Sequence, residues 1–221
     1  MTRLEDNKME MYQPIRANAA RDHRFRNLLG AAQWARLPQA IRRRFGKRLS
    51  GGNSVTYQGQ VIDMQMNWAG RLLAQALRLV GAPLPFDAAA VGQPAVVVVT
   101  EDHASDGQFW VRQYGRGRGF PQVVHSSKRF AGPTGLEEYI GYGIGMALKI
   151  EASDDALYFK SDHYFVQWGQ RRLRLPRWLG PGALVIGHHD LGGDAFLFSL
   201  RLRSRLLGLL IAQDARFQDA S

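Results

Sequence analysis

The residues of this chain best suited to chemistry are an arginine between two aromatic side chains and an acid further along. Trp110, Arg112 and Tyr114 are spaced two apart, which places them on one face of a strand. An arginine beside aromatic rings can stack on them and bind a carboxylate or phosphate through paired N–H groups. We expect Glu138 to pair with Arg112 when no ligand is bound. The alternative is a surface stripe with ordinary cross-strand packing, and the spacing favours neither.

The histidines are candidate acid–base groups. His188-His189-Asp190 is the densest cluster, but adjacent strand residues point to opposite faces, so His188 and His189 cannot easily share one metal ion. An enzyme would use His163 or His188, oriented by Glu138 or Asp190. Since a histidine among aromatic residues is usually a packed core residue, this is the alternative hypothesis.

Alternation along the strand of His163 groups this histidine with Phe159 and Phe165. The opposite face would then carry Asp162 and Tyr164. We include His163 among the candidate ligand-binding residues.

Two glycine-rich segments fall short of known ligand motifs. Gly141-Tyr142-Gly143-Ile144-Gly145 lacks the spacing and the βαβ unit of a dinucleotide loop, and such glycines more often mark a bulge or bend. The arginine–glycine tract at 115–120 has two arginines between strands, which is typical of a hairpin loop rather than an RNA-binding segment. The chain has no cysteine, which excludes disulfides and thiolate ligands. We predict no cofactor and no metal site.

The positive charge is concentrated in the first quarter of the chain. Through residue 50 there are 12 Lys/Arg and 4 Asp/Glu, against 17 and 15 in the rest. Without a recognition motif, this makes nucleic acid an unlikely partner. An interaction protein docking on an acidic protein or an anionic membrane surface is a third hypothesis. The docking residues would be Arg42, Arg43, Arg44, Lys47 and Arg48.

The elements that position these residues divide the chain in two. Residues 1–20 have no clear periodicity and predict a flexible N-terminal arm, and residues 21–221 predict a single β-rich domain. Helices are expected near 23–46, broken at Leu37-Pro38, and over 67–80 with Asn67 as the cap. No apolar run is long enough for a signal peptide or a membrane-spanning helix, so we expect a cytoplasmic protein.

Most of the remaining chain alternates apolar and polar residues in short runs. These predict strands over residues 55–66, 95–101, 108–114, 146–151, 157–168, 183–188 and 196–203. Arg201, Arg203 and Arg205 share one strand face, and we expect that face to lie in water because a ladder of like charges is costly to bury. The pattern predicts an α+β, mainly β fold: a curled antiparallel sheet or partly open barrel packed by a few helices.

Several stretches resemble one family of bacterial proteins. They are residues 25–30 with Trp34 and Leu37-Pro38, the Trp110-x-Arg112-x-Tyr114 set, residues 135–141, residues 175–181 including Arg177, and residues 206–210. In this order they resemble domain-of-unknown-function family 4166. The resemblance implies a small β-rich domain, sometimes attached to nucleotide-dependent oxidoreductase-like domains. It implies no activity, because none is established for the family.

Strand alternation with aromatic residues, and no catalytic motif, favour a binding module over an enzyme. The leading hypothesis is a non-catalytic barrel that holds a small apolar or amphipathic ligand, with or without an anionic group. Its candidate ligand-binding residues are Trp110, Arg112, Tyr114, Glu138, His163 and Arg177.

Overall fold

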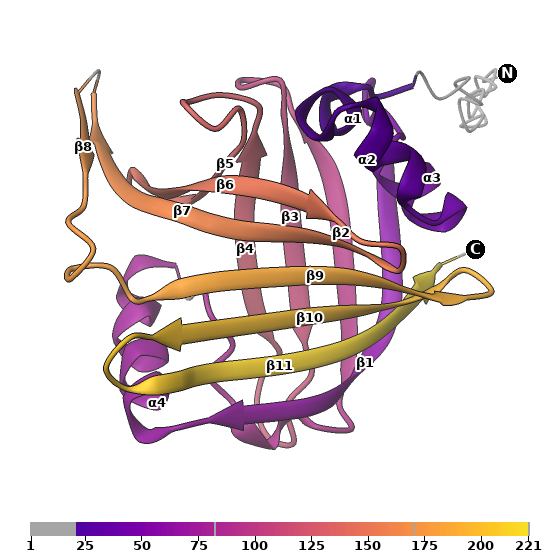
Figure 1. Ribbon diagram of the computed structural model, residues 1–221. Coiled ribbons are helices and arrows are strands. Elements are labelled where there is room, and N and C mark those ends of the chain that lie inside the picture. Colours follow the sequence, from indigo (N-terminus) through magenta and orange to yellow (C-terminus); the bar gives the residue numbers. More distant parts are fainter. Residues whose placement is uncertain (1–20, 82, 170, 221) are drawn as a thin grey trace, which may run out of the picture.

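The fold is a β-barrel with helices at two of its sides (Figure 1). A computed structural model describes residues 21–81, 83–169 and 171–220. The predicted arm over residues 1–20 lies outside the described residues. No helix in the described ranges is long and apolar enough to cross a membrane.

Within the described residues, ten strands form a closed antiparallel barrel. Each strand pairs with the next one along the chain, and the last pairs with the first. The strands are β1 (Ser54–Met66), β2 (Pro94–Asp102), β3 (Gly107–Tyr114), β4 (Gln122–Arg129), β5 (Glu137–Gly141), β6 (Ile144–Ala152), β7 (Ala156–Trp168), β9 (Ala183–Gly192), β10 (Ala195–Ser204) and β11 (Gly208–Asp219). The short β8 (Arg171–Arg174) pairs only with the end of β7.

The predicted mainly β fold is confirmed, with a barrel that is closed rather than partly open. Closure depends on β11, which pairs with β1 from Met66 to Tyr57 and with β10 on its other side. The alternation in the sequence missed β4, β5, β8 and β11. Their runs are short or place polar side chains on the buried face, so a search for alternating apolar residues passes over them.

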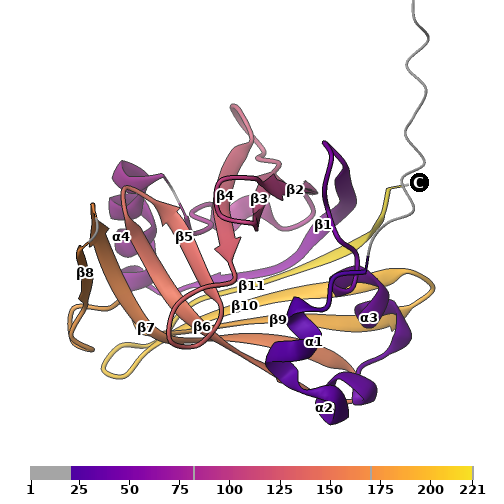
Figure 2. The ribbon, with the colours of Figure 1, turned by 90° about the horizontal axis from the view of Figure 1, so that it is seen from above.

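Three short helices cover one end of the barrel, which we call the α3 end (Figure 2). They are α1 (Arg24–Leu29), α2 (Ala31–Arg36) and α3 (Gln39–Phe45). The expected first helix is split because Gly30 has φ of 80°. Helix α3 starts after Pro38, where the break was expected, and has Gly46 as its C-cap. Its Phe45 packs on Trp110, with ring centroids 6.4 Å apart, and so closes this end.

The opposite end, which we call the α4 end, carries α4 (Trp68–Ala76) followed by the 3-10 helices η1 (Leu77–Val80) and η2 (Ala88–Ala90). The predicted Asn67 cap is confirmed: Gly70 N donates to Asn67 Oδ1 at 2.8 Å. Apolar residues four apart, Trp68, Leu72, Ala76 and Val80, predict this helix, but the repeat faces outward, since Trp68 and Leu72 are 67% and 64% exposed. Helix α4 instead turns Gly70 toward β11, where an added Cβ would lie 2.0 Å from the carbonyl oxygen of Leu210.

Candidate ligand-binding site

A cavity of about 80 Å³ lies inside the barrel toward the α4 end. Its wall is mainly apolar and includes Leu84, Ile144, Leu184 and Leu200. A single buried water needs roughly 10–15 Å³, so this space suits a small organic molecule or several waters.

Polar side chains form the inner boundary of the cavity, which we call the floor. On β3 the cavity is lined by Arg112 but not by Trp110, two residues deeper in the barrel. On β4 it is lined by Ser126 but not by Lys128. Glu138 of β5 also lines the cavity and completes the floor.

A buried ionic cluster joins the floor to the layer beneath it. Glu138 accepts a hydrogen bond of 2.5 Å from Ser126 Oγ and lies 3.6 Å from Arg112 Nη2. Lys128 Nζ lies 3.1 Å from Glu138 Oε2. That contact lacks hydrogen-bond geometry, since Oε2 has no hydrogen-bond partner. Arg112, Lys128 and Glu138 are all at most 6% exposed, so their charges interact with one another rather than with solvent.

The pKa values indicate that the cluster is ionised at neutral pH. Burial by itself would raise the pKa of Glu138, but the positive charges of Lys128 and Arg112 and the Ser126 hydrogen bond lower it to about 2. Burial lowers the pKa of Lys128 to about 8 even though the charge of Glu138 opposes the change. Two cations therefore face one carboxylate, and the cluster has an excess of positive charge.

Arg112 has hydrogen-bonding capacity to spare. Its guanidinium carries five N–H donors. Among the described residues it makes one hydrogen bond, from Nη1 to Ser126 Oγ at 3.2 Å. The floor can therefore offer several donors to an anion entering the cavity.

Further unsatisfied polar groups lie deeper, toward the α3 end. His188 Nδ1 and Arg44 Nε and Nη1 are buried without a hydrogen-bond partner in the described structure. Arg44 Cζ lies 3.8 Å from the centre of the Phe196 ring. Burial, followed by the charges of Arg44 and Lys128, lowers the pKa of His188 well below 6.5, so His188 is neutral. The barrel interior thus contains a third cation, to which no acid is paired among residues 21–81, 83–169 and 171–220.

The structure brings together some of the six residues proposed from the sequence. Arg112, Tyr114 and Glu138 line the cavity, and Glu138 is in place as the expected partner of Arg112. Trp110 lies beneath the floor with its ring 4.8 Å from Lys128 Nζ. Arg177 is exposed on the loop between β8 and β9 and does not line the cavity.

His163 points away from the cavity, on the outer face of the barrel wall, because β7 contains a bulge. Ala147 pairs with His163 and Leu148 with Ser161, so Asp162 is an extra residue that shifts the alternation. Tyr164 therefore lines the cavity, while His163 Nδ1 lies 2.8 Å from Asp162 Oδ2. The expected grouping of His163 with Phe159 is wrong for the same reason, whereas Phe165 does share the face of His163, with ring centroids 6.3 Å apart.

Phe159 belongs to the barrel core, whereas Phe165 packs against Tyr139 and Arg172. His188 points inward and His189 outward, as expected for neighbours on a strand. In the part of the chain that the structure describes, no hydrogen bond or ion pair joins His188 to a carboxylate, and no three potential metal ligands cluster. The geometry therefore does not assemble the acid–base pairs considered in the sequence.

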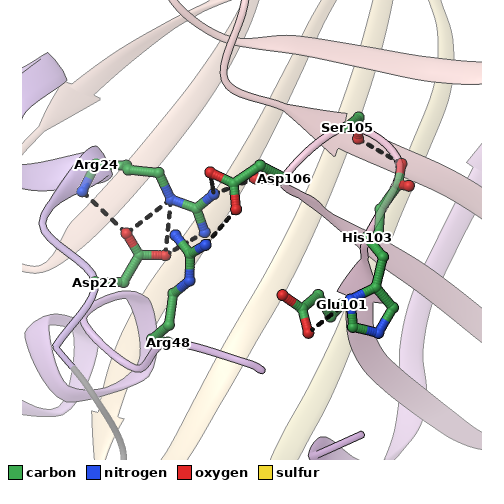
Figure 3. A network of polar contacts seen from close by, with 8 residues as sticks. Asp22, Arg24, Arg48, Glu101, His103, Ser105 and Asp106 are labelled. Carbon is green, nitrogen blue, oxygen red and sulfur yellow. Dashed lines mark hydrogen bonds and ion pairs between the residues drawn. The ribbon is translucent and has the colours of Figure 1, made fainter. Parts of the chain in front are cut away.

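The basic residues near the α3 end are largely engaged within the protein. Arg24 Nη2 lies 2.6 Å from Asp22 Oδ2, and Arg48 forms an ion pair with Asp106 in the turn after β2 (Figure 3). Arg43 pairs with Asp194, and the side chain of Arg44 turns into the barrel. Arg42 and Lys47 line a surface hollow on the helices. Docking of this region on an acidic partner stays a prediction.

Sequence reasoning missed Lys128, Ser126 and Tyr164. Lysine and serine are typical surface residues, so neither was expected in the interior. The one indication in the sequence is that Ser126 and Lys128 alternate with Val124 along β4, which places all three on one face. The bulge that turns Tyr164 inward has no clear sequence signal.

These features define a class of protein: an up-and-down antiparallel barrel with a small apolar cavity above a buried ionic cluster. A family model described as "Domain of unknown function (DUF4166)" matches residues 37–217. The chain therefore belongs to this family. No curated protein and no solved structure matches it.

Proposed function

We propose that the barrel binds a small molecule with an apolar body and one anionic end. The observation that carries the proposal is Arg112, a buried guanidinium with unused donors at the floor of an apolar cavity. The apolar wall would hold the body of the ligand by the hydrophobic effect, and Arg112 would bind its carboxylate or phosphate. Barrels of about this strand number are known to hold one small ligand.

Electrostatics supports an anionic rather than a cationic ligand. Glu138 already faces both Arg112 and Lys128, so its negative charge is matched before any ligand arrives. A bound anion would offset the remaining positive charge, whereas a bound cation would add to it.

The first experiment is native mass spectrometry of freshly purified protein, with solvent extraction of anything bound. The second is calorimetric titration with straight-chain carboxylates and the alcohols of the same lengths. Affinity should rise with chain length until the cavity is full, because each buried CH₂ contributes about 0.8 kcal/mol.

The Arg112→Gln variant separates the two parts of the site. It should weaken carboxylate binding by roughly tenfold to a hundredfold, the usual value of a charge-assisted hydrogen bond, and leave alcohol binding unchanged. Arg171→Gln, on the exposed β8, is the matched control. A protein that carries no ligand and binds neither series would contradict the proposal.

A further inference from the structure

One face of the molecule at the α4 end combines exposed apolar side chains with arginines. It is formed by α4 and η1, residues 141–143, the end of β7, β8, residues 175–182 and residues 205–207, and we call it the arginine–tryptophan face. Figures 1 and 2 both place α4, β8 and the β10–β11 turn on the same side of the molecule, at the left.

The apolar side chains of this face are unusually exposed. Trp168 is 87% exposed, Trp178 80% and Leu206 93%. Trp68, Leu72 and Tyr142 on the same face are also exposed. Single exposed apolar residues are normal, but a gathering of large ones marks an interaction surface.

The charge of these segments has one sign. Residues 68–80, 141–143, 166–168, 171–182 and 205–207 contain seven arginines and no aspartate or glutamate. Arg172 and Arg174 are paired with Glu137 and Asp162 from other strands. Among the described residues, Arg171, Arg177 and Arg205 have no ion-pair partner, so the face has a positive excess.

We propose that the arginine–tryptophan face docks on an anionic lipid membrane surface. Tryptophan and tyrosine are enriched at membrane–water interfaces because an apolar ring with one polar group suits that region. Arginines near an anionic surface each contribute through attraction to lipid head groups. The same combination of apolar and basic side chains is how interfacial proteins bind without crossing the bilayer.

The side-chain types favour lipid over nucleic acid. Binding of single-stranded nucleic acid uses aromatic rings as stacking platforms for bases. Much of the exposed apolar area here is leucine, including Leu72, Leu173 and Leu206, which has no ring to stack on. Leucine does gain from contact with acyl chains.

The cavity lies next to this face. Leu77 of η1 and Pro181 of the 175–182 loop both line it, and both belong to segments that form the face. A docked barrel would hold its cavity beside the membrane, from which an amphipathic ligand could enter. This last step rests on the proposed function, whereas the docking does not.

The test is sedimentation of the full-length protein with vesicles of phosphatidylcholine, with and without phosphatidylglycerol. We expect binding to the anionic vesicles alone, decreasing with salt. Arg171→Ala/Arg177→Ala should weaken it by roughly fivefold per arginine. Trp168→Ala/Trp178→Ala should also weaken it, and tryptophan fluorescence of the unmodified protein should shift to the blue on binding.

Matched variants at the α3 end test the location. Arg42→Ala/Lys47→Ala removes two exposed cations there, and Leu191→Ala removes an exposed apolar side chain; both should bind vesicles normally. The arginine, lysine, tryptophan and leucine variants at the surface are all at exposed positions, and circular dichroism checks the folding of these variants and of the buried Arg112→Gln. Arg112→Gln should lose carboxylate binding but keep vesicle binding, which separates docking from the proposed function.

Three results would overturn the docking proposal. The first is that the protein does not sediment with anionic vesicles at low salt. The second is that Arg42→Ala/Lys47→Ala abolishes vesicle binding while Arg171→Ala/Arg177→Ala leaves it unchanged. The third is a face already occupied, shown by a dimer in analytical ultracentrifugation that Trp168→Ala/Trp178→Ala converts to a monomer. A single-stranded oligonucleotide that binds through the same arginines, with no vesicle binding, would indicate nucleic acid instead.

Discussion

At the scale of single residues, the ionic cluster of Arg112, Lys128 and Glu138 dominates the barrel interior. Removing one member of a buried ion pair leaves the other charge without compensation, at a typical cost of about 3–5 kcal/mol. A purely apolar interior of the same shape would often be equally stable. The cluster therefore says little about stability. It is better explained as part of a ligand site, in which the unused N–H donors of Arg112 would bind the ligand.

The cluster should make the protein sensitive to acid. Since the pKa of Glu138 is about 2 in the folded protein and 4.5 is its ordinary value, its contribution is complete above pH 4.5 and is lost as the pH falls toward 2. The expected loss is about 3 kcal/mol in the free energy of unfolding. Urea denaturation at a series of pH values measures it.

Glu138→Gln is the control for this prediction. The variant should be less stable at neutral pH, because Lys128 and Arg112 lose their counter-charge, and the glutamine should contribute no slope between pH 4.5 and 2. A variant with the same acid profile as the unmodified protein would show that Glu138 does not cause the sensitivity.

At the scale of elements, alternation along a strand was informative where the strand is regular. Trp110, Arg112 and Tyr114 share the inward face of β3 as their spacing predicts. The same reasoning fails on β7, because the bulge at Asp162 reverses the faces of everything after it. Alternation also did not show which face of β3 is buried. Arg112 on the face of Trp110 and Tyr114 is as typical of a surface as of an interior.

For helix α4 too, the periodicity predicts the element but not which of its sides is buried. Its apolar repeat predicts a helix correctly, but a second apolar side, with Gly70 and Ala74 against β11 and Leu73 on the core, is the one that is buried. Small residues allow that approach, and nothing in the repeat itself indicates it.

Gly70→Ala tests this packing through the sign of its effect. In a helix interior, Ala is more stable than Gly by roughly 0.5–1 kcal/mol. Here the new Cβ would meet the Leu210 carbonyl oxygen at 2.0 Å, so we expect a net loss of about 1–3 kcal/mol in urea denaturation.

Gly117→Ala is a matched control, since an added Cβ there meets nothing within 4 Å. It should leave stability nearly unchanged. If Gly70→Ala were instead stabilising, α4 would not be held against β11.

At the scale of the whole molecule, the two ends of the barrel are closed by different means. The α3 end is filled by aromatic side chains, with Phe45 packed on Trp110, Phe159 and His188. The α4 end retains the cavity. A binding barrel needs this asymmetry, because an interior open at both ends would fill with water.

Phe45→Ala should open the closed end. The variant is expected to lose about 3–5 kcal/mol of stability, as other buried Phe→Ala changes do, and to change the fluorescence of Trp110. Phe120→Ala, in the exposed loop after β3, removes the same side chain at no such cost. Equal stability of the two variants would mean that Phe45 does not seal the barrel.

The pairing of β1 with β11 also has a consequence during synthesis of the protein. Tyr57 pairs with Asp219, about 160 residues later in the chain. As the ribosome makes the polypeptide, β2 can join β1 early, but the other edge of β1 must wait until almost all of the barrel has emerged. At about 5–20 residues per second, a nascent chain would expose that edge for roughly ten seconds or more, which makes it a site for chaperone binding.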